Sequence, residues 1–136
     1  MTLKKFVLLV EDEEMQLKLF SKIIANEIRS YGYEVVTLSN GKDAIKFLSG
    51  GKSDLDISRD EVGLILVDLS MYDISGFQVI EEIKSLGLTM PVAVLTAHDD
   101  AKIAKEAKKL GAADYFIKGK DVKELDRLKN FIIKAF

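Results

Sequence analysis

Short apolar runs in this sequence end in side chains that could do chemistry together. Carboxylates follow the first and third runs, a hydroxyl follows the fourth, and an amine follows the fifth: Glu11, Asp12, Asp68, Thr96 and Lys118. Carboxylates that share one crevice repel one another, which raises their pKa values or demands a cation. A small set of hard oxygen ligands suits Mg²⁺, which keeps several waters and holds phosphate oxygens. The residue types therefore indicate a magnesium-dependent phosphate chemistry.

Asp68 is the residue of this set that could react. With a metal ion beside it, its carboxylate could attack a phosphoryl donor as a nucleophile. Lys118 and Thr96 could then neutralise and hydrogen-bond the transferred oxygens. Phosphoryl transfer needs mostly positioning and charge neutralisation, and this set of residues supplies both.

The elements that must position these residues can be read from the apolar patterns. Runs of apolar or β-branched residues without alternation are typical of strands covered on both faces, and they lie at 6–10, 35–38, 62–67, 92–95 and 115–117. Apolar residues at helical spacing lie between or after them, as in 17–31, 103–110 and 122–132. The strict alternation predicts an α/β fold with a parallel sheet and helices on both faces. In such a sheet, ligands bind beyond the carboxyl ends of the strands, where the strand order reverses.

Helix boundary signals agree with this assignment. Asn40 is placed to start the second helix, and Asp121 with Glu124 forms a D-x-x-E capping pattern for the last one. Gly87 and Gly111 are placed to end the third and fourth helices. One segment does not fit the compact pattern, because residues 50–61 are long for a loop between a helix and a strand.

Composition limits the function classes. A length of 136 residues fits one domain, 1–136, with no room for an output domain. A net charge of −2 gives no support for direct nucleic-acid binding, and the lack of cysteine excludes disulfides and thiolate sites. No apolar run approaches the roughly 18 residues that span a bilayer, and the N-terminal one is too short for a signal peptide. We therefore expect a cytoplasmic protein without membrane contact.

At this point the chain resembles the receiver domains of response regulators over essentially its whole length. VLLVEDEE is similar to the first strand of that family with its acidic pair, and VDLSMYDISG to the phosphorylation segment, with Gly76 eight residues after Asp68. VLTA is similar to the segment of the switch hydroxyl, and GAADYFIK to that of the switch aromatic and the lysine. Each motif alone is weak, but four in the right order at strand ends are specific.

The resemblance implies a fold and a metal site. The fold would be the flavodoxin-like (βα)5 three-layer sandwich with a parallel sheet of order 2-1-3-4-5. Mg²⁺, with Mn²⁺ as an alternative, would be bound directly by Asp12 and Asp68, through water by Glu11, and by the backbone carbonyl of Ser70.

The resemblance also implies how the switch works. Asp68 would accept the phosphoryl group with the help of Lys118 and Thr96. Thr96 would move toward the new phosphoryl group and Tyr115 would turn inward behind it. His98, two residues after Thr96, would overhang the site, where with Ser70 it could tune access or dephosphorylation; the plainer interpretation is a solvated loop histidine.

The resemblance further implies the partners. A histidine kinase or a histidine phosphotransfer protein would be the donor, and an unknown downstream protein would bind the surface of helix four, strand five and helix five. The chain would be a signalling protein rather than an enzyme, since it would assist only its own phosphorylation and dephosphorylation. Either a monomer or a dimer linked to phosphorylation would be compatible with the sequence.

Two departures from the family pattern leave an alternative open. Gly119 stands where the family usually has a proline with a cis bond, so we expect a trans peptide there and a less certain placement of Lys118. Tyr72 replaces a common proline four residues after the acceptor. The alternative is therefore a degenerate receiver that binds partners independently of phosphorylation. An enzyme on a similar sheet is less well supported, because the D-x-D motif of dehalogenase-type phosphatases is absent after the first strand.

Overall fold

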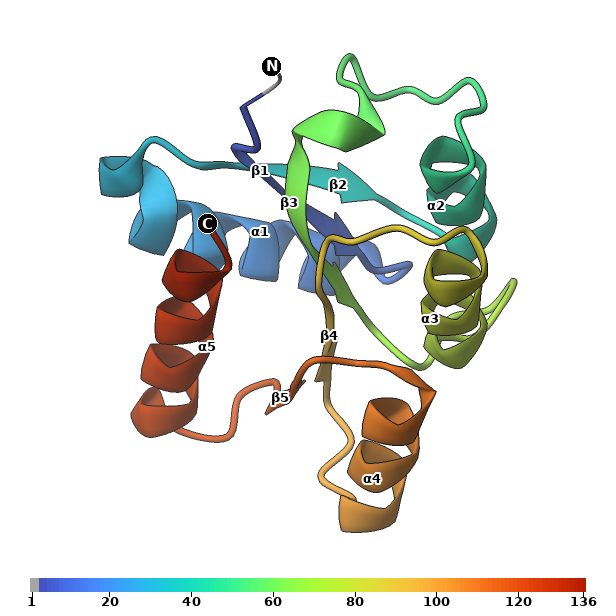
Figure 1. Ribbon diagram of the computed structural model, residues 1–136. Helices are drawn as coiled ribbons and strands as arrows, with labels where there is room; N and C mark the ends of the chain where they lie inside the picture. The colour runs from blue at the N-terminus through green and yellow to red at the C-terminus, as the bar shows by residue number, and fades with distance from the viewer. Residues whose placement is uncertain (1–2) are drawn as a thin grey trace.

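Strands and helices alternate along the chain in the computed structural model, which describes residues 3–136 (Figure 1). The strands are β1 (Phe6–Val10), β2 (Glu34–Leu38), β3 (Val62–Val67), β4 (Val92–Thr96) and β5 (Tyr115–Ile117). The helices are α1 (Glu14–Ile28), α2 (Gly41–Leu48), α3 (Gly76–Ser85), α4 (Ala101–Leu110) and α5 (Val122–Ala135), with short 3-10 turns at Arg29–Tyr31 and Arg59–Glu61. Within the described residues, no helix is both long enough and apolar enough to cross a membrane.

The five strands form one parallel sheet of order β2-β1-β3-β4-β5, which confirms the predicted order. Each predicted strand is found within one residue of its expected bounds. In the register of the sheet, Val10 lies opposite Val67, so the residues that follow them, Glu11 and Asp68, leave neighbouring strands side by side. The strand order reverses between β1 and β3, which is where the crevice of such a sheet lies.

Helices cover both faces of the sheet (Figure 1). Side chains that alternate along β1 show this directly, because Leu8 packs in the core with α2, α3 and α4, whereas Leu9 packs in the core with α1 and α5. All five residues of β1 and all six of β3 are buried. Strands covered on both faces explain the uninterrupted apolar runs of the sequence.

The predicted helix boundaries are confirmed, but two apolar positions differ. Asn40 accepts a hydrogen bond from a backbone N–H of the first turn of α2, and Asp121 does the same for α5. Gly111 ends α4 with φ at 118°, a left-handed conformation that suits glycine. The helical patterns of 17–31 and 122–132 include Tyr31 and Val122, but both are exposed, because α1 ends before Tyr31 and Val122 is the first residue of α5.

The long segment 50–61 is packed against the body rather than extended into solvent. Leu55 and Ile57 pack on the core under α2. Ser58 and Glu61 form a capping box for the 3-10 turn that leads into β3, and Arg59 donates a hydrogen bond to the carbonyl of Leu48. Buried apolar groups and satisfied backbone groups thus offset part of the entropy that a long loop loses on ordering.

Two glycines allow close approaches, and replacing them should have different costs. A Cβ on Gly76 would lie 2.3 Å from the backbone oxygen of Asp68, whereas a Cβ on Gly63 would meet only the ring of Phe136, at 2.4 Å. The backbone at Asp68 and Leu69 cannot move aside cheaply, whereas the ring of Phe136 belongs to a side chain that can rotate away. We expect Gly76→Ala to lower the free energy of unfolding by about 3 kcal/mol and Gly63→Ala by about 1 kcal/mol in urea titrations. Equal losses in the two variants would contradict this interpretation.

Candidate functional site

The carboxyl ends of β1, β3, β4 and β5 bring together the residues singled out in the sequence. In the part of the chain that the structure describes, only three polar or charged residues are classed as buried: Glu11, Asp68 and Thr96. Buried polar groups are costly unless they are paired, so three of them at one sheet edge indicate a site rather than a folding requirement.

Lys118 lies at the centre of this site. Its Nζ donates to Oε1 of Glu11 at 2.7 Å and to Oδ2 of Asp68 at 2.9 Å, and its side chain is 6% exposed. Its backbone N–H donates to the carbonyl of Thr96 at 2.7 Å, which fixes the start of the β5–α5 loop. The described residues contain no cis peptide, as expected at Gly119, whose φ is +68°. Lys118 thus contacts both carboxylates although a glycine with positive φ, rather than a proline, follows it.

The two buried carboxylates differ in their electrostatics. Burial first, and then the neighbouring Asp68, raise the pKa of Glu11 to about 7. Burial also acts to raise the pKa of Asp68, but hydrogen bonding with Glu11 and with Lys118 outweighs it and lowers that pKa below its usual value. Asp68 is therefore the more readily ionised member of the pair, and Glu11 is the member that holds a proton near neutral pH.

The carboxylate of Asp12 has a different hydrogen-bond partner from those of Glu11 and Asp68. Its Oδ2 accepts a hydrogen bond from the backbone N–H of Tyr72 at 2.7 Å. A proline at position 72 could not donate this bond, so the departure at Tyr72 has a structural consequence. Among residues 3–136, His, Cys, Asp and Glu form no group of three that is arranged around a common ion. The metal-ligand roles of Glu11, Asp12 and Asp68 therefore stay predictions.

The chemistry of the site nevertheless fits a divalent cation. Oε2 of Glu11 is buried without a hydrogen-bond partner in the described chain. Glu11 and Asp68 both contact the single ammonium of Lys118, so a divalent cation would balance the second carboxylate once Glu11 loses its proton. Hard oxygen donors in this number are what Mg²⁺ prefers. Ser70 donates its N–H to Oδ1 of Asp68 at 3.2 Å, and the role of its carbonyl as a ligand stays a prediction.

The loops after β3 and β4 are joined across the site. Oγ of Ser70 and Nε2 of His98 lie 2.7 Å apart, so His98 is exposed but held in a hydrogen bond. The hydroxyl of Tyr115 donates to the carbonyl of His98 at 2.7 Å, and Tyr115 is buried. Burial, followed by the charge of nearby Asp100, raises the pKa of Tyr115. Tyr115 is thus buried and tied to the loop after β4, and its predicted movement in the switch stays a prediction.

Sequence reasoning missed one residue that positions the acceptor loop. The carboxylate of Asp73 accepts from the backbone N–H of Gly41 at 3.1 Å and of Lys42 at 2.8 Å. The first turn of α2 therefore holds the loop that follows Asp68. Although burial opposes it, hydrogen bonding from these amides and from Ile74 lowers the pKa of Asp73. No local pattern could reveal the contact, because its partners lie 31 and 32 residues apart in the sequence.

Known proteins are similar to this chain in sequence. The curated "Two-component response regulator ARR12" of Arabidopsis thaliana is 28% identical over 95% of this chain, and "Transcriptional regulatory protein ZraR" of Salmonella typhimurium is 30% identical over 95%. The alignments cover only 20% and 26% of those two proteins. The chain therefore spans about a fifth to a quarter of the length of these relatives.

Solved structures give the same picture. The signal receiver domain of a putative Luxo repressor protein from Vibrio parahaemolyticus matches with a TM-score of 0.77 and 28% identity, over 98% of this chain and 90% of that one. The Mn²⁺-bound form of response regulator Rcp1 matches with a TM-score of 0.73 and 28% identity, over 94% and 91%. The family model of the response regulator receiver domain matches residues 7–129. With the fold, the sheet order and the strand-end residues in agreement, the chain belongs to the family of response regulator receiver domains.

Proposed function

We propose that this chain is a phosphoryl-accepting signalling switch in which Asp68 is the acceptor. Receiver domains are signalling domains of two-component systems rather than classical enzymes. The observation that carries the proposal is the ammonium of Lys118, within 2.9 Å of both Asp68 and Glu11 in a largely buried site. An ionised carboxylate with a fixed cation beside it can attack phosphorus while the charge on the transferred oxygens is balanced.

The roles of the other residues follow from their positions. Lys118 would leave Asp68 to pair with an oxygen of the transferred group, and Thr96 would donate its hydroxyl to another. Glu11, Asp12, Asp68 and the carbonyl of Ser70 would hold Mg²⁺, which supplies charge neutralisation for the incoming phosphoryl group. Mn²⁺ is an alternative ion, in line with the Mn²⁺-bound relative.

The proposed partners are those of the family. A histidine kinase or a histidine phosphotransfer protein would supply the phosphoryl group in the cytoplasm, because receiver domains interact with such proteins. A downstream protein would bind the face formed by α4, β5 and α5. Tyr115 supports this surface, since its hydroxyl ties β5 to the loop that leads into α4.

A direct test is incubation of the chain with acetyl phosphate and Mg²⁺. The expected product carries one added phosphoryl mass, and fragmentation after borohydride reduction should locate it at Asp68. The adduct should be lost at alkaline pH, because acyl phosphates hydrolyse there. Absence of any adduct with acetyl phosphate and with phosphoramidate would contradict the proposal.

A phosphorylation-independent interaction module is the second candidate. Two observations favour it, because Tyr115 is already buried and bonded, and the Tyr72 amide already occupies one oxygen of Asp12. This candidate predicts that beryllofluoride with Mg²⁺ leaves the NMR signals of Tyr115 and of α4 unchanged. The switch predicts shifts in both.

The hydrogen bond between Ser70 and His98 should affect how long the phosphoryl group persists. The pair joins the two loops beside Asp68, where it would restrict the approach of water to the phosphoryl group. Loss of one hydrogen bond corresponds to about a fivefold change in rate, so we expect His98→Ala to shorten the phosphoryl lifetime by about fivefold. Ser70→Ala should do the same and the double variant should add little more. Lifetimes that are unchanged, or additive effects in the double variant, would show that the bond does not guard the site.

A further inference from the structure

Helix α4 carries a concentration of positive charge that the rest of the chain does not share. Four lysines and one glutamate give this ten-residue helix a formal charge of +3, whereas the whole chain has a charge of −2. The charged residues are Lys102, Lys105, Lys108, Lys109 and Glu106. This helix therefore has the highest formal charge of the five helices, on a slightly acidic protein.

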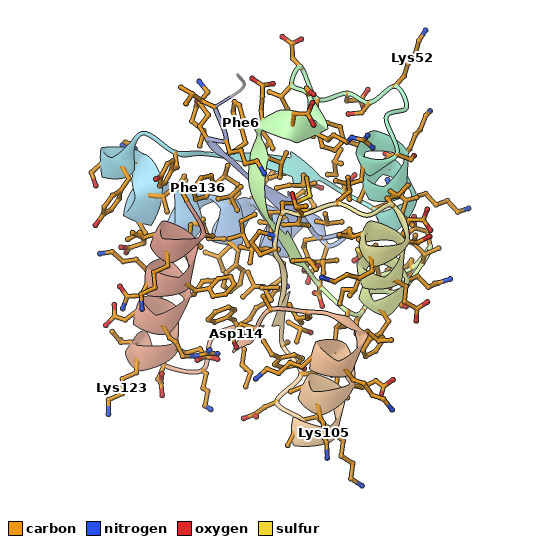
Figure 2. All side chains as sticks on the ribbon, in the orientation of Figure 1. Phe6, Lys52, Lys105, Asp114, Lys123 and Phe136 are labelled. Atoms are coloured by element: carbon orange, nitrogen blue, oxygen red, sulfur yellow. The ribbon has the colours of Figure 1, made fainter. Side chains whose placement is uncertain are left out.

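Three of the lysines lie on one face of α4. Lys102, Lys105 and Lys109 follow the spacing i, i+3 and i+7, which places them along one side of a helix. All three are exposed, and Figure 2 shows Lys105 pointing away from the body of the molecule. The opposite side faces the core through the buried Ala107. We call Lys102, Lys105 and Lys109 the lysine stripe.

The stripe has no counter-charge in the structure. Across residues 3–136, none of its three ammonium groups lies within 4.0 Å of a carboxylate, and the neighbouring Lys108 reaches Asp114 only at 4.0 Å. Some basic side chains on other helices do have a carboxylate partner among the described residues, whereas no lysine of the stripe has one. On α1, for example, Lys18 lies 3.0 Å from Glu14. The charge of the stripe is thus available to another molecule.

The spacing of the stripe also works against the helix itself. Lysines three and four residues apart repel one another on a helix surface. Lys102 stands in the first turn, where the helix dipole disfavours a cation. The carboxylate of the N-cap Asp100 accepts hydrogen bonds from backbone N–H groups of the first turn of α4, but within the described residues it makes no ion pair with the stripe. Lys109 lies in the last turn, where the dipole favours a cation, so the unfavourable terms are those of Lys102 and of the repulsion between neighbouring lysines.

We infer that the lysine stripe docks an acidic segment of the downstream protein, an inference that rests on the proposed switch function. A helix of ten residues is about 15 Å long, which matches a short acidic helix laid along it. Nucleic acid fits less well, because Asp99, Asp100 and Glu106 border the stripe and would oppose a continuous phosphate backbone. The stripe follows the loop held by Tyr115 and His98, so a change at Asp68 reaches it through that loop.

The test uses a synthetic twelve-residue helical peptide with glutamates at i, i+3, i+4 and i+7, added to the labelled chain with beryllofluoride and Mg²⁺. The peptide should shift the amide signals of residues 101–110 most strongly. Lys105→Gln with Lys109→Gln should weaken binding by about fivefold, as expected for two lost surface ion pairs. The matched control is Lys22→Gln with Lys52→Gln, which removes the same charge from exposed positions elsewhere and should leave the affinity within about twofold.

Three outcomes would overturn the inference: equal weakening in both double variants, no shifts in α4, or shifts of the same residues by duplex DNA at lower concentrations than by the peptide. Acetyl phosphate labelling of each variant separates this test from the test of the switch. Normal labelling with failed docking would contradict the acidic partner alone. Failed labelling of the unaltered chain would contradict the switch, and the peptide titration would still decide the role of the stripe.

Discussion

Asp68→Ala is expected to lose the phosphoryl adduct completely and, in the absence of divalent ions, to be more stable than the parent chain at pH 8. The first effect follows because the nucleophile is removed. The second follows because two buried carboxylates share one ammonium in the parent chain. Without Asp68, Glu11 and Lys118 form a neutral pair, and the site no longer buries an excess negative charge.

The pH dependence of this gain can be worked out from Glu11. Folded Glu11 keeps its proton up to about pH 7, whereas its ordinary pKa is 4.5. The folded state therefore binds the extra proton, and the stability of the parent chain falls as the pH rises through this window. Removing Asp68 removes one cause of the raised pKa, although burial remains. We expect a gain of about 1 kcal/mol at pH 8 that shrinks toward pH 5.

Urea denaturation of both chains in EDTA at pH 5 and pH 8 measures this difference. Asp114→Ala is a suitable control, because Asp114 lies outside the site and has its own partner in Arg127. Added Mg²⁺ should stabilise the parent chain more than Asp68→Ala. If Asp68→Ala is less stable than the parent chain at pH 8, burial of the Asp68 carboxylate does not lower the free energy of unfolding of the parent chain.

Lys118→Met is expected to be the most destabilising substitution in the site. Methionine keeps most of the aliphatic volume but removes the ammonium that both carboxylates contact. Removing one partner of a buried ion pair costs about 3–5 kcal/mol, because the remaining charge is left unpaired. The loss should be largest at pH 8 and smaller at pH 5, where Glu11 is protonated. Thermal unfolding in EDTA at the two pH values measures it.

Two further variants decide whether the charge is the cause. Glu11→Gln added to Lys118→Met removes the second carboxylate and should recover much of the lost stability. Lys123→Met, on the exposed part of α5, should change stability little. If the double variant is as unstable as Lys118→Met alone, packing around the lysine rather than charge pairing would explain the loss.

The strands were predictable because burial on both faces leaves an uninterrupted apolar run in the sequence, whereas their order came from the resemblance to receiver domains. Glu11, Asp68, Thr96 and Lys118 could be assigned for the same reason, since each directly follows such a run. The carboxyl ends of parallel strands lie at one edge of the sheet, so residues that directly follow different strands were expected to lie close together.

The contacts between loops could not be predicted. The Tyr72 amide meets Asp12 across 60 residues of sequence, and Ser70 meets His98 across 28. These pairings depend on the path of irregular backbone, which leaves no periodic signal. Tyr31 was misassigned for a related reason, because the helical pattern of α1 continues into a 3-10 turn whose different pitch points it outward.

The burial of Tyr115 has a practical consequence for spectroscopy. The chain has four tyrosines and no tryptophan, so its ultraviolet emission comes from tyrosine alone. Tyr31 and Tyr33 stack on each other at the far end of the molecule, and Tyr72 is fully exposed. Tyr115 is the tyrosine whose buried hydroxyl donates to the carbonyl of His98 beside the site, so unlabelled protein carries its own optical reporter of occupancy, readable in a cuvette.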